Sequence, residues 1–174
     1  MAITTFPVVS GAVIVDAGDT DAKMEPGTVL AYRSGTDQWA IIQYIKNAQA
    51  AAVKKGAPMV PDYATLKQYI VRIAATADAG TPLAGITLAS LGASKYGFIA
   101  IHGWVESAEL SHTAASGEFL MISGSTAAML TPDKASVFNA GTHGSSSMFM
   151  VVGVARTAIA TGLGSITITG WWGV

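Results

Sequence analysis

Apolar and polar residues alternate with a period of two along several short segments of the chain. This alternation predicts half-buried β-strands, because successive side chains of a strand point to opposite faces of a sheet. Clusters of glycine, serine, asparagine and aspartate separate the segments and predict turns. Four strands are expected at residues 8–15, 28–33, 69–74 and 119–123.

The most regular pattern occurs twice, at an offset of 67 residues: residues 97–105 are GFIAIHGWV and residues 164–172 are GSITITGWW. Each copy places its isoleucines on one face, continues with a glycine that permits a bulge or tight bend, and ends on an aromatic residue. A shorter apolar run precedes each copy, at residues 84–88 and 151–155. The repeat predicts two similar β-hairpins. Isoleucines spaced by two between glycines are also common in unrelated strands, so chance similarity is the alternative interpretation.

Residues 38–55 fit two different structures. Ile41, Tyr44, Ile45 and Ala48 have helical spacing, and the alanine-rich stretch that follows favours some helix. The first part of the same segment also alternates as a strand does. Periodicity leaves both interpretations open.

Together these elements predict a mainly β protein, a single-domain β-barrel or β-sandwich built of hairpins, with one short helix allowed near residues 38–55. A length of 174 residues and a mass of 17.8 kDa fit one domain over residues 1–174. Its N-terminal part, residues 1–80, contains the helical alternative. Its second part, residues 84–174, contains the two similar hairpins.

Ionic side chains are sparse for a chain of this length. Lysine and arginine number 10, aspartate and glutamate 11, and charged residues make up 12% of the chain, against about 25% in an ordinary soluble domain. Mean hydropathy is +0.44. A formal charge of −1 gives no basic patch for nucleic acid or for an anionic membrane. So few charges predict that other polypeptides cover part of the exterior, as in a component of an assembly.

Charge is sparsest at the C-terminal end, where residues 135–174 contain one formally charged residue, Arg156. A membrane-spanning helix is not expected there, because glycine, serine and threonine interrupt residues 157–174 and the pattern has period two. The first residues lack the basic and apolar regions of a signal peptide, so no export is expected. Cysteine is absent, which excludes disulfides and Cys-ligated zinc.

Polar residues that could carry chemistry form only weak groupings. No nucleophile elbow, phosphate-binding loop or His-Glu-x-x-His motif occurs. Glu106, Glu109 and His112 would share one face of a helix, yet they follow a predicted strand and fit a solvated edge better. The acidic cluster at residues 16–25 departs from a calcium loop, and His143 lies in a Gly/Ser-rich loop without an acid to orient it. We therefore predict that the chain is not an enzyme and has no catalytic, cofactor-binding or metal-binding residues.

The four tryptophans are Trp39, Trp104, Trp171 and Trp172. Aromatic side chains exposed on a rigid sheet bind sugars or partner proteins, but core packing is the simpler interpretation for Trp39 and Trp104. Since neighbours on a strand point to opposite faces, one of the adjacent pair is expected at an interface. The candidate assembly contacts are Trp171, Trp172, Trp104, Phe149 and Met150.

Several strand-like stretches follow one another in a recognisable order. They are residues 95–103 (KYGFIAIHG), 116–122 (SGEFLMI) followed by 130–132 (LTP), and 152–155 (VGVA) leading to 166–168 (ITI). This order resembles that of small head-decoration or capsid-cement proteins of bacteriophages. The resemblance covers roughly residues 84–170, and the N-terminal half matches only loosely.

The resemblance implies a virion structural protein that binds and stabilises the outer surface of a phage capsid after synthesis in the host cytoplasm. The implied partners are the major capsid protein of the same virus and further copies of the chain, as a homotrimer, with no cofactor, nucleic acid or membrane. Two alternatives stay open: a phage tail component, and a carbohydrate-binding or adhesin module with Trp104 or Trp171 as its platform. A small hydrolase or metal enzyme that uses His102, His112 or His143 is the remaining hypothesis.

Overall fold

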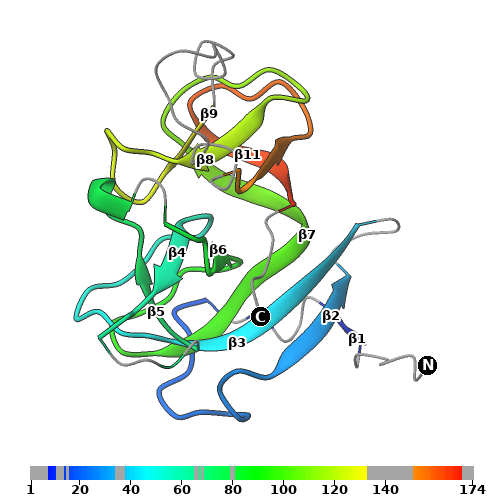
Figure 1. The fold of residues 1–174 in the computed structure, drawn as a ribbon. Helices are drawn as coiled ribbons and strands as arrows, with labels where there is room; N and C mark the ends of the chain where they lie inside the picture. Colours follow the sequence, from blue (N-terminus) through cyan, green and yellow to red (C-terminus); the bar gives the residue numbers. More distant parts are fainter. Residues whose placement is uncertain are drawn as a thin grey trace.

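The computed structural model describes residues 8–10, 14, 16–33, 38–64, 67, 69–78, 81–132 and 151–169. These residues form an 11-stranded sheet with the strand order β1-β2-β3-β5-β4-β6-β7-β11-β10-β8-β9, and a single 3-10 turn at Thr76–Asp78 (Figure 1). The mainly β class is therefore confirmed. The strands are β1 (Val8–Ser10), β2 (Val29–Arg33), β3 (Trp39–Asn47), β4 (Pro58–Pro61), β5 (Ile70–Ile73), β6 (Gly85–Thr87), β7 (Tyr96–Leu110), β8 (Phe119–Ile122), β9 (Leu130–Pro132), β10 (Gly153–Ala155) and β11 (Gly162–Ile168).

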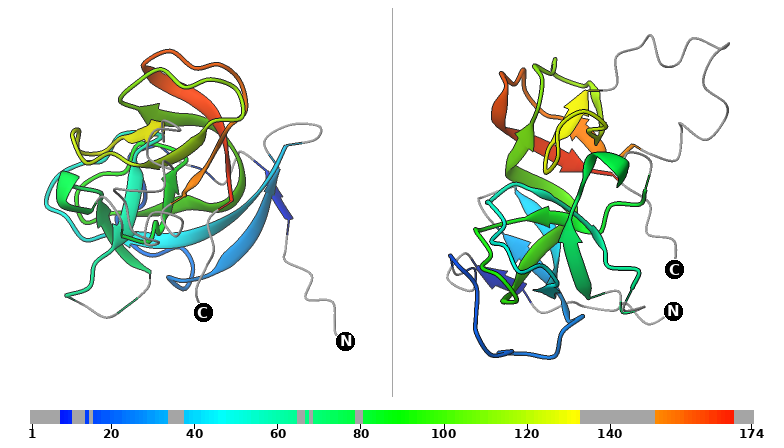
Figure 2. Two further views of the ribbon diagram at one scale, coloured as in Figure 1. Left: turned by 45° about the horizontal axis from the view of Figure 1, so that its top comes forward. Right: turned by 90° about the vertical axis from the view of Figure 1, so that its left-hand side faces the viewer.

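The sheet closes on itself twice, and β7 takes part in both closures. β3 pairs directly with β7, which closes a first circuit of β3, β5, β4, β6 and β7. Leu110 of β7 pairs with Leu130 of β9, which closes a second circuit of β7, β11, β10, β8 and β9. Figures 1 and 2 show these two groups of strands at opposite ends of the molecule, with β7 running from one to the other.

Both predicted hairpins are present as antiparallel strand pairs. β6 pairs with β7, and β10 pairs with β11. The two similar strands also pair with each other, because β11 lies antiparallel to β7. The repeated isoleucines Ile99, Ile101, Ile166 and Ile168 are all buried. Burial in the core therefore explains the isoleucines that the two copies share.

Gly103 is the point where β7 bends. Its φ is +89°, a conformation that L side chains rarely adopt, and a Cβ there would collide with the carbonyl oxygen of Trp39. The register between β3 and β7 shifts close by, between Ile41 and Ile42. The predicted glycine bend is confirmed at Gly103, whereas its counterpart Gly170 lies outside the described residues.

For residues 39–47 the helical interpretation is wrong, because this part of the segment 38–55 is a strand. Residues Trp39–Asn47 form β3, which pairs with β2 on one side and with β7 on the other. Ile42, Tyr44 and Ile45 are fully buried there. Tertiary packing between two neighbouring strands thus overrides the helical spacing of these residues.

The other strand predictions agree with the structure to within one residue at each end, except at the N-terminus. Residues 28–33, 69–74 and 119–123 contain β2, β5 and β8, while the part of residues 8–15 that the structure describes as strand is β1. Periodicity missed β4, a short strand that begins and ends with proline.

Buried side chains occupy both faces of the first half of β7. Phe98 and Ala100 belong to one core cluster, and Ile99 and Ile101 belong to the other. The first cluster continues through the second circuit. Burial on both faces explains why residues 97–101 of this strand are an uninterrupted run without polar side chains.

The described C-terminal strands direct alternate residues inward. Ala155, Ile166 and Ile168 lie in the first core cluster, so part of the uncharged C-terminal sequence serves the core. Val154 and Thr167 lie on the opposite face and are only partly buried. Within the described ranges, no helix has the length and apolar character needed to cross a membrane.

Candidate interaction surface

The outward positions of β8, β10 and β11 carry no ionic side chain. A sheet face directed toward water usually alternates apolar inward residues with polar outward ones. Here the outward Phe119 and Leu163 are large, apolar and 47% and 57% exposed. We call this outward set the neutral face; its members are Phe119, Met121, Val154, Leu163, Ser165 and Thr167.

A row of directly paired residues extends the neutral face onto β7. Phe119 is opposite Val154, Val154 is opposite Thr167, and Thr167 is opposite Trp104. Side chains of directly opposed residues share one face of a sheet. The row therefore crosses four strands and ends at Trp104.

Arg156 covers one side of the Trp104 indole. Its guanidinium carbon lies 4.9 Å from the ring centroid, a distance at which the cation is attracted by the negative face of the ring. The face under Arg156 is therefore not open for a sugar to stack on. This arrangement weakens the interpretation of Trp104 as a carbohydrate platform.

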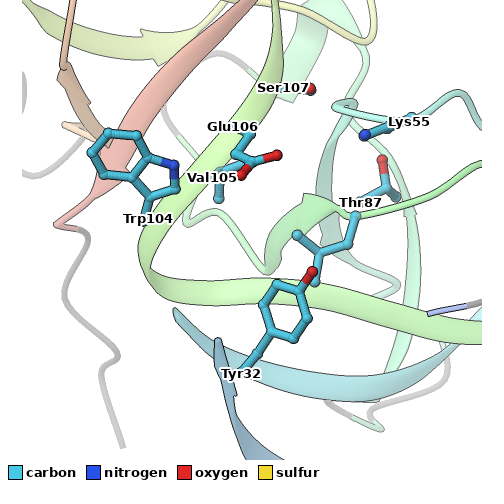
Figure 3. Close-up of a pocket in the computed structure, with 8 residues that line it drawn as sticks. Tyr32, Lys55, Thr87, Trp104, Val105, Glu106 and Ser107 are labelled. Carbon is cyan, nitrogen blue, oxygen red and sulfur yellow. The ribbon is translucent and has the colours of Figure 1, made fainter. Parts of the chain in front are cut away.

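A small recess lies beside Trp104, among residues of β2, β6 and β7 (Figure 3). Its volume is about 40 Å³, enough for a few water-sized groups. Figure 3 shows the Nε1 edge of Trp104 turned toward the recess, and that atom is buried without a hydrogen-bond partner. The polar residues around it come from β2, from the loop before β4, from β6 and from β7: Tyr32, Lys55, Thr87, Trp104, Glu106 and Ser107.

Some polar groups of the recess already make hydrogen bonds within the fold, so they are less available to a ligand than the others. The Thr87 hydroxyl donates to the Lys54 carbonyl oxygen at 2.7 Å and accepts from the Ala57 amide at 3.0 Å, so its bonds serve the fold. Burial raises the pKa of Tyr32, and the nearby Glu106 carboxylate raises that pKa further. Tyr32 therefore stays a neutral hydroxyl at physiological pH. Together with the Trp104 indole, it gives the recess an aromatic wall.

Of the five candidate assembly contacts, the structure describes only Trp104, which is half-buried. Trp171, Trp172, Phe149 and Met150 lie outside the described residues. Trp39, for which core packing was the simpler interpretation, is 46% exposed, so that prediction is wrong.

The other polar candidates are spread over the surface. Glu106 and Glu109 lie on β7 and His112 follows it, so their spacing is not that of a helix face. The His112 Nδ1 lies 2.9 Å from the Ser111 hydroxyl. His102 is an exposed residue of β7, and His143 lies outside the described residues. Among the residues that the structure describes, no three His, Asp or Glu side chains are grouped to hold a metal ion.

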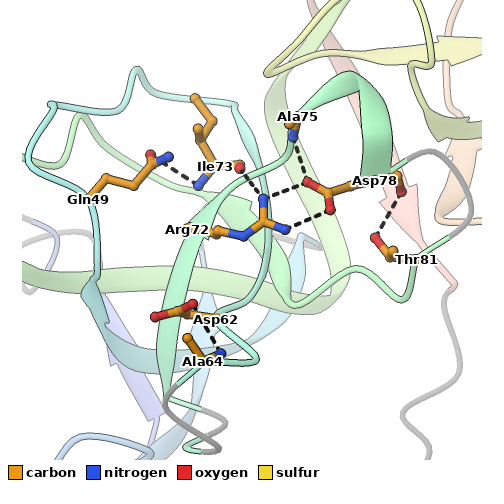
Figure 4. Close-up of polar contacts among 8 residues, drawn as sticks. All are labelled: Gln49, Asp62, Ala64, Arg72, Ile73, Ala75, Asp78 and Thr81. Carbon is orange, nitrogen blue, oxygen red and sulfur yellow. Dashed lines mark hydrogen bonds and ion pairs between the residues drawn. The ribbon is translucent and has the colours of Figure 1, made fainter.

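Arg72 and Asp78 form an ion pair that serves the fold (Figure 4). Arg72 donates two hydrogen bonds to the Asp78 carboxylate, at 2.6 and 2.7 Å, and the Ala75 amide donates a third at 2.7 Å. These bonds fix the 3-10 turn against β5. They also hold the pKa of Asp78 below its ordinary value, the hydrogen bonds from Arg72 being the largest cause.

No protein-family model matches the sequence, and no curated protein matches it. Among solved structures, the chain is similar to the head fiber gp8.5 N base of bacteriophage phi29, with a TM-score of 0.49 and 12% sequence identity. The match covers 74% of this chain and 94% of that one.

Proposed function

We propose that this chain is a virion structural protein that binds other polypeptides of a phage head through its neutral face. In this role it decorates and stabilises the outer surface of the capsid, by contacts with the major capsid protein and with two further copies of itself. The proposal involves no catalysis. The observation that carries it is the absence of ionic side chains from the outward positions of β8, β10 and β11.

The sequence resemblance supports the same proposal, because most of the stretches that carry it lie in the second circuit. Residues 96–103 form the half of β7 that pairs with β3 and β6, and the later stretches contain β8, β9, β10 and part of β11. The neutral face is thus built on the strands that resemble capsid-cement proteins.

Burial of the neutral face is physically favourable. Covering apolar surface stabilises a contact by roughly 25 cal/mol per Å². The six positions themselves carry no charge, so dehydrating their side chains costs no ionic hydration, while Arg156 and Glu109 lie beside them and have to keep contact with water or meet a partner. Six residues are a small part of a standard interface of about 1,600 Å², so contacts repeated around a symmetric shell have to supply the remaining strength.

Co-sedimentation with empty heads of the virus that encodes the chain tests the proposal. We expect saturable binding by the wild type and at least tenfold weaker binding by Val154→Lys, which places a charge in the middle of the neutral face. Ala93→Lys is the matched control, because Ala93 is exposed in a turn of the first circuit. Circular dichroism should show that both variants are folded.

Failure of the wild-type chain to bind heads would overturn the proposal, and so would undiminished binding by Val154→Lys. Binding to purified tails but not to heads would assign the chain to the tail instead. Sedimentation of the chain alone over a range of concentrations tests whether it forms a trimer. A monomer at all concentrations would contradict the proposed self-association.

A further inference from the structure

We propose that the recess beside Trp104 binds a neutral primary carboxamide, the side chain of an asparagine or glutamine from a polypeptide that lies on the neutral face. The inference deepens the proposed function, on which it rests for the identity of the partner. It starts from one atom: Trp104 Nε1 is buried and has no hydrogen-bond partner.

The indole nitrogen defines the first requirement for a ligand. An indole N–H can only donate, so the ligand must bring an acceptor oxygen to it. A buried donor without an acceptor is unfavourable, and a ligand that supplies one removes this cost. A carbonyl oxygen meets the requirement.

Glu106 defines the second requirement. A carboxylate accepts hydrogen bonds and does not donate them. Glu106 lines the same recess as Trp104, and Figure 3 shows both side chains directed toward it. The ligand must therefore carry a donor as well as an acceptor. A carboxamide carries both on one planar group, its oxygen for Trp104 and its NH2 for Glu106.

Charge balance favours a neutral ligand. Lys55 also lines the recess, and its ammonium offsets the charge of Glu106. A carboxylate ligand would meet Glu106 as a like charge. An ammonium ligand would meet Lys55 and would leave Trp104 Nε1 without an acceptor. A neutral amide avoids both conflicts.

Size and position favour a side chain over a free sugar. A recess of about 40 Å³ holds a terminal group of a few atoms. Lys55 and Glu106 are exposed, so the aliphatic stem of an asparagine or glutamine has an entry from the surface. Trp104 also ends the row that begins at Phe119. A polypeptide that follows this row therefore reaches the recess.

Nuclear magnetic resonance of the isolated chain tests the chemistry of the recess. The indole N–H signal of Trp104, assigned with Trp104→Phe, is followed while propionamide, propionate, propylamine or methyl glucoside is added. We expect a saturable downfield shift with propionamide and at least tenfold weaker effects from the other three. No shift with propionamide, or a stronger response to any other probe, would overturn the inference.

Charge variants sharpen the test. In Glu106→Gln the recess loses its negative charge, so we expect propionamide to bind several-fold more weakly and propionate to gain a measurable affinity. Glu109→Gln removes the same charge from the same strand but away from the recess, and we expect it to behave as the wild type. Equal behaviour of the two variants would contradict the role of Glu106.

Head binding distinguishes this inference from the proposed function. We expect Trp104→Phe to weaken binding to heads about tenfold, because the partner's amide loses its donor. A propionamide response without any head binding would leave the recess chemistry intact and overturn the proposed function. Full head binding by Trp104→Phe would overturn the assignment of the amide to a head polypeptide.

Discussion

The guanidinium of Arg156 reaches across β11 to the indole of Trp104, with 4.9 Å between the guanidinium carbon and the ring centroid. Arg156 directly follows β10, and β11 is the strand between β10 and β7. The contact therefore ties three strands of the second circuit together on the outside. It also fixes the indole whose other edge lines the recess.

This contact should be measurable as a coupling energy. We expect a double-mutant cycle with Arg156→Ala and Trp104→Leu to give about 0.5–1 kcal/mol of coupling, the usual size for an exposed cation over an aromatic ring. Urea unfolding of the four proteins checks it. Additive effects of the two substitutions would show that the contact contributes no stability.

Gly103→Ala should be much more destabilising than Gly117→Ala. Both glycines have positive φ, +89° and +82°, so alanine should cost about 1 kcal/mol at either position for backbone conformation alone. Only at Gly103 would the new Cβ also meet the Trp39 carbonyl oxygen, whereas at Gly117 nothing lies within 4 Å. We expect about 3 kcal/mol or more at Gly103 by chemical denaturation. Equal losses would contradict the close approach of β3 and β7.

Asp78→Asn should remove part of the pH dependence of stability. The pKa of Asp78 is lowered in the folded protein, mainly by the hydrogen bonds from Arg72. A lowered carboxyl pKa stabilises the fold above the unfolded pKa of about 4, and this stability is lost as the pH falls through the folded value. We expect a loss of about 2 kcal/mol at neutral pH and a smaller difference from wild type in acid. Thermal unfolding at several pH values measures it, with the exposed Asp21→Asn as control.

Tyr44→Phe should make the stability of the fold less dependent on pH in the alkaline range. Burial raises the pKa of Tyr44, with the Asp19 carboxylate contributing, and its hydroxyl donates to Asp19 at 3.2 Å. A raised tyrosine pKa means that stability is complete below about pH 10 and is lost as the pH rises through the folded value. We expect Tyr44→Phe to lose about 1 kcal/mol at neutral pH and to be less sensitive to base. The exposed Tyr63→Phe should retain the wild-type profile.

The sequence predicts the strands of this fold better than their arrangement. The isoleucines of the repeat lie in the core as their alternation requires, and Gly103 makes the expected bend. The double closure through β7 could not be predicted, since it depends on pairings between strands far apart in the chain, such as Leu110 with Leu130. The structure of residues 39–47 could not be predicted for the same reason. They form a strand because they pair with β2 and β7, and these pairings are not visible in the periodicity of the segment.

The recess could not be found from the sequence either. Tyr32, Lys55, Thr87 and Glu106 come from separate segments, and no spacing links them. Trp104 was a candidate contact because of its residue type and its place at the end of the repeat. The unpartnered state of its indole nitrogen is visible only once the strands are packed.

The strand shared by the two circuits has a mechanical consequence. Fifteen residues long, β7 is hydrogen-bonded along its length to neighbours in both halves of the sheet. A displacement of β7 therefore disturbs hydrogen bonds in both halves of the sheet at once.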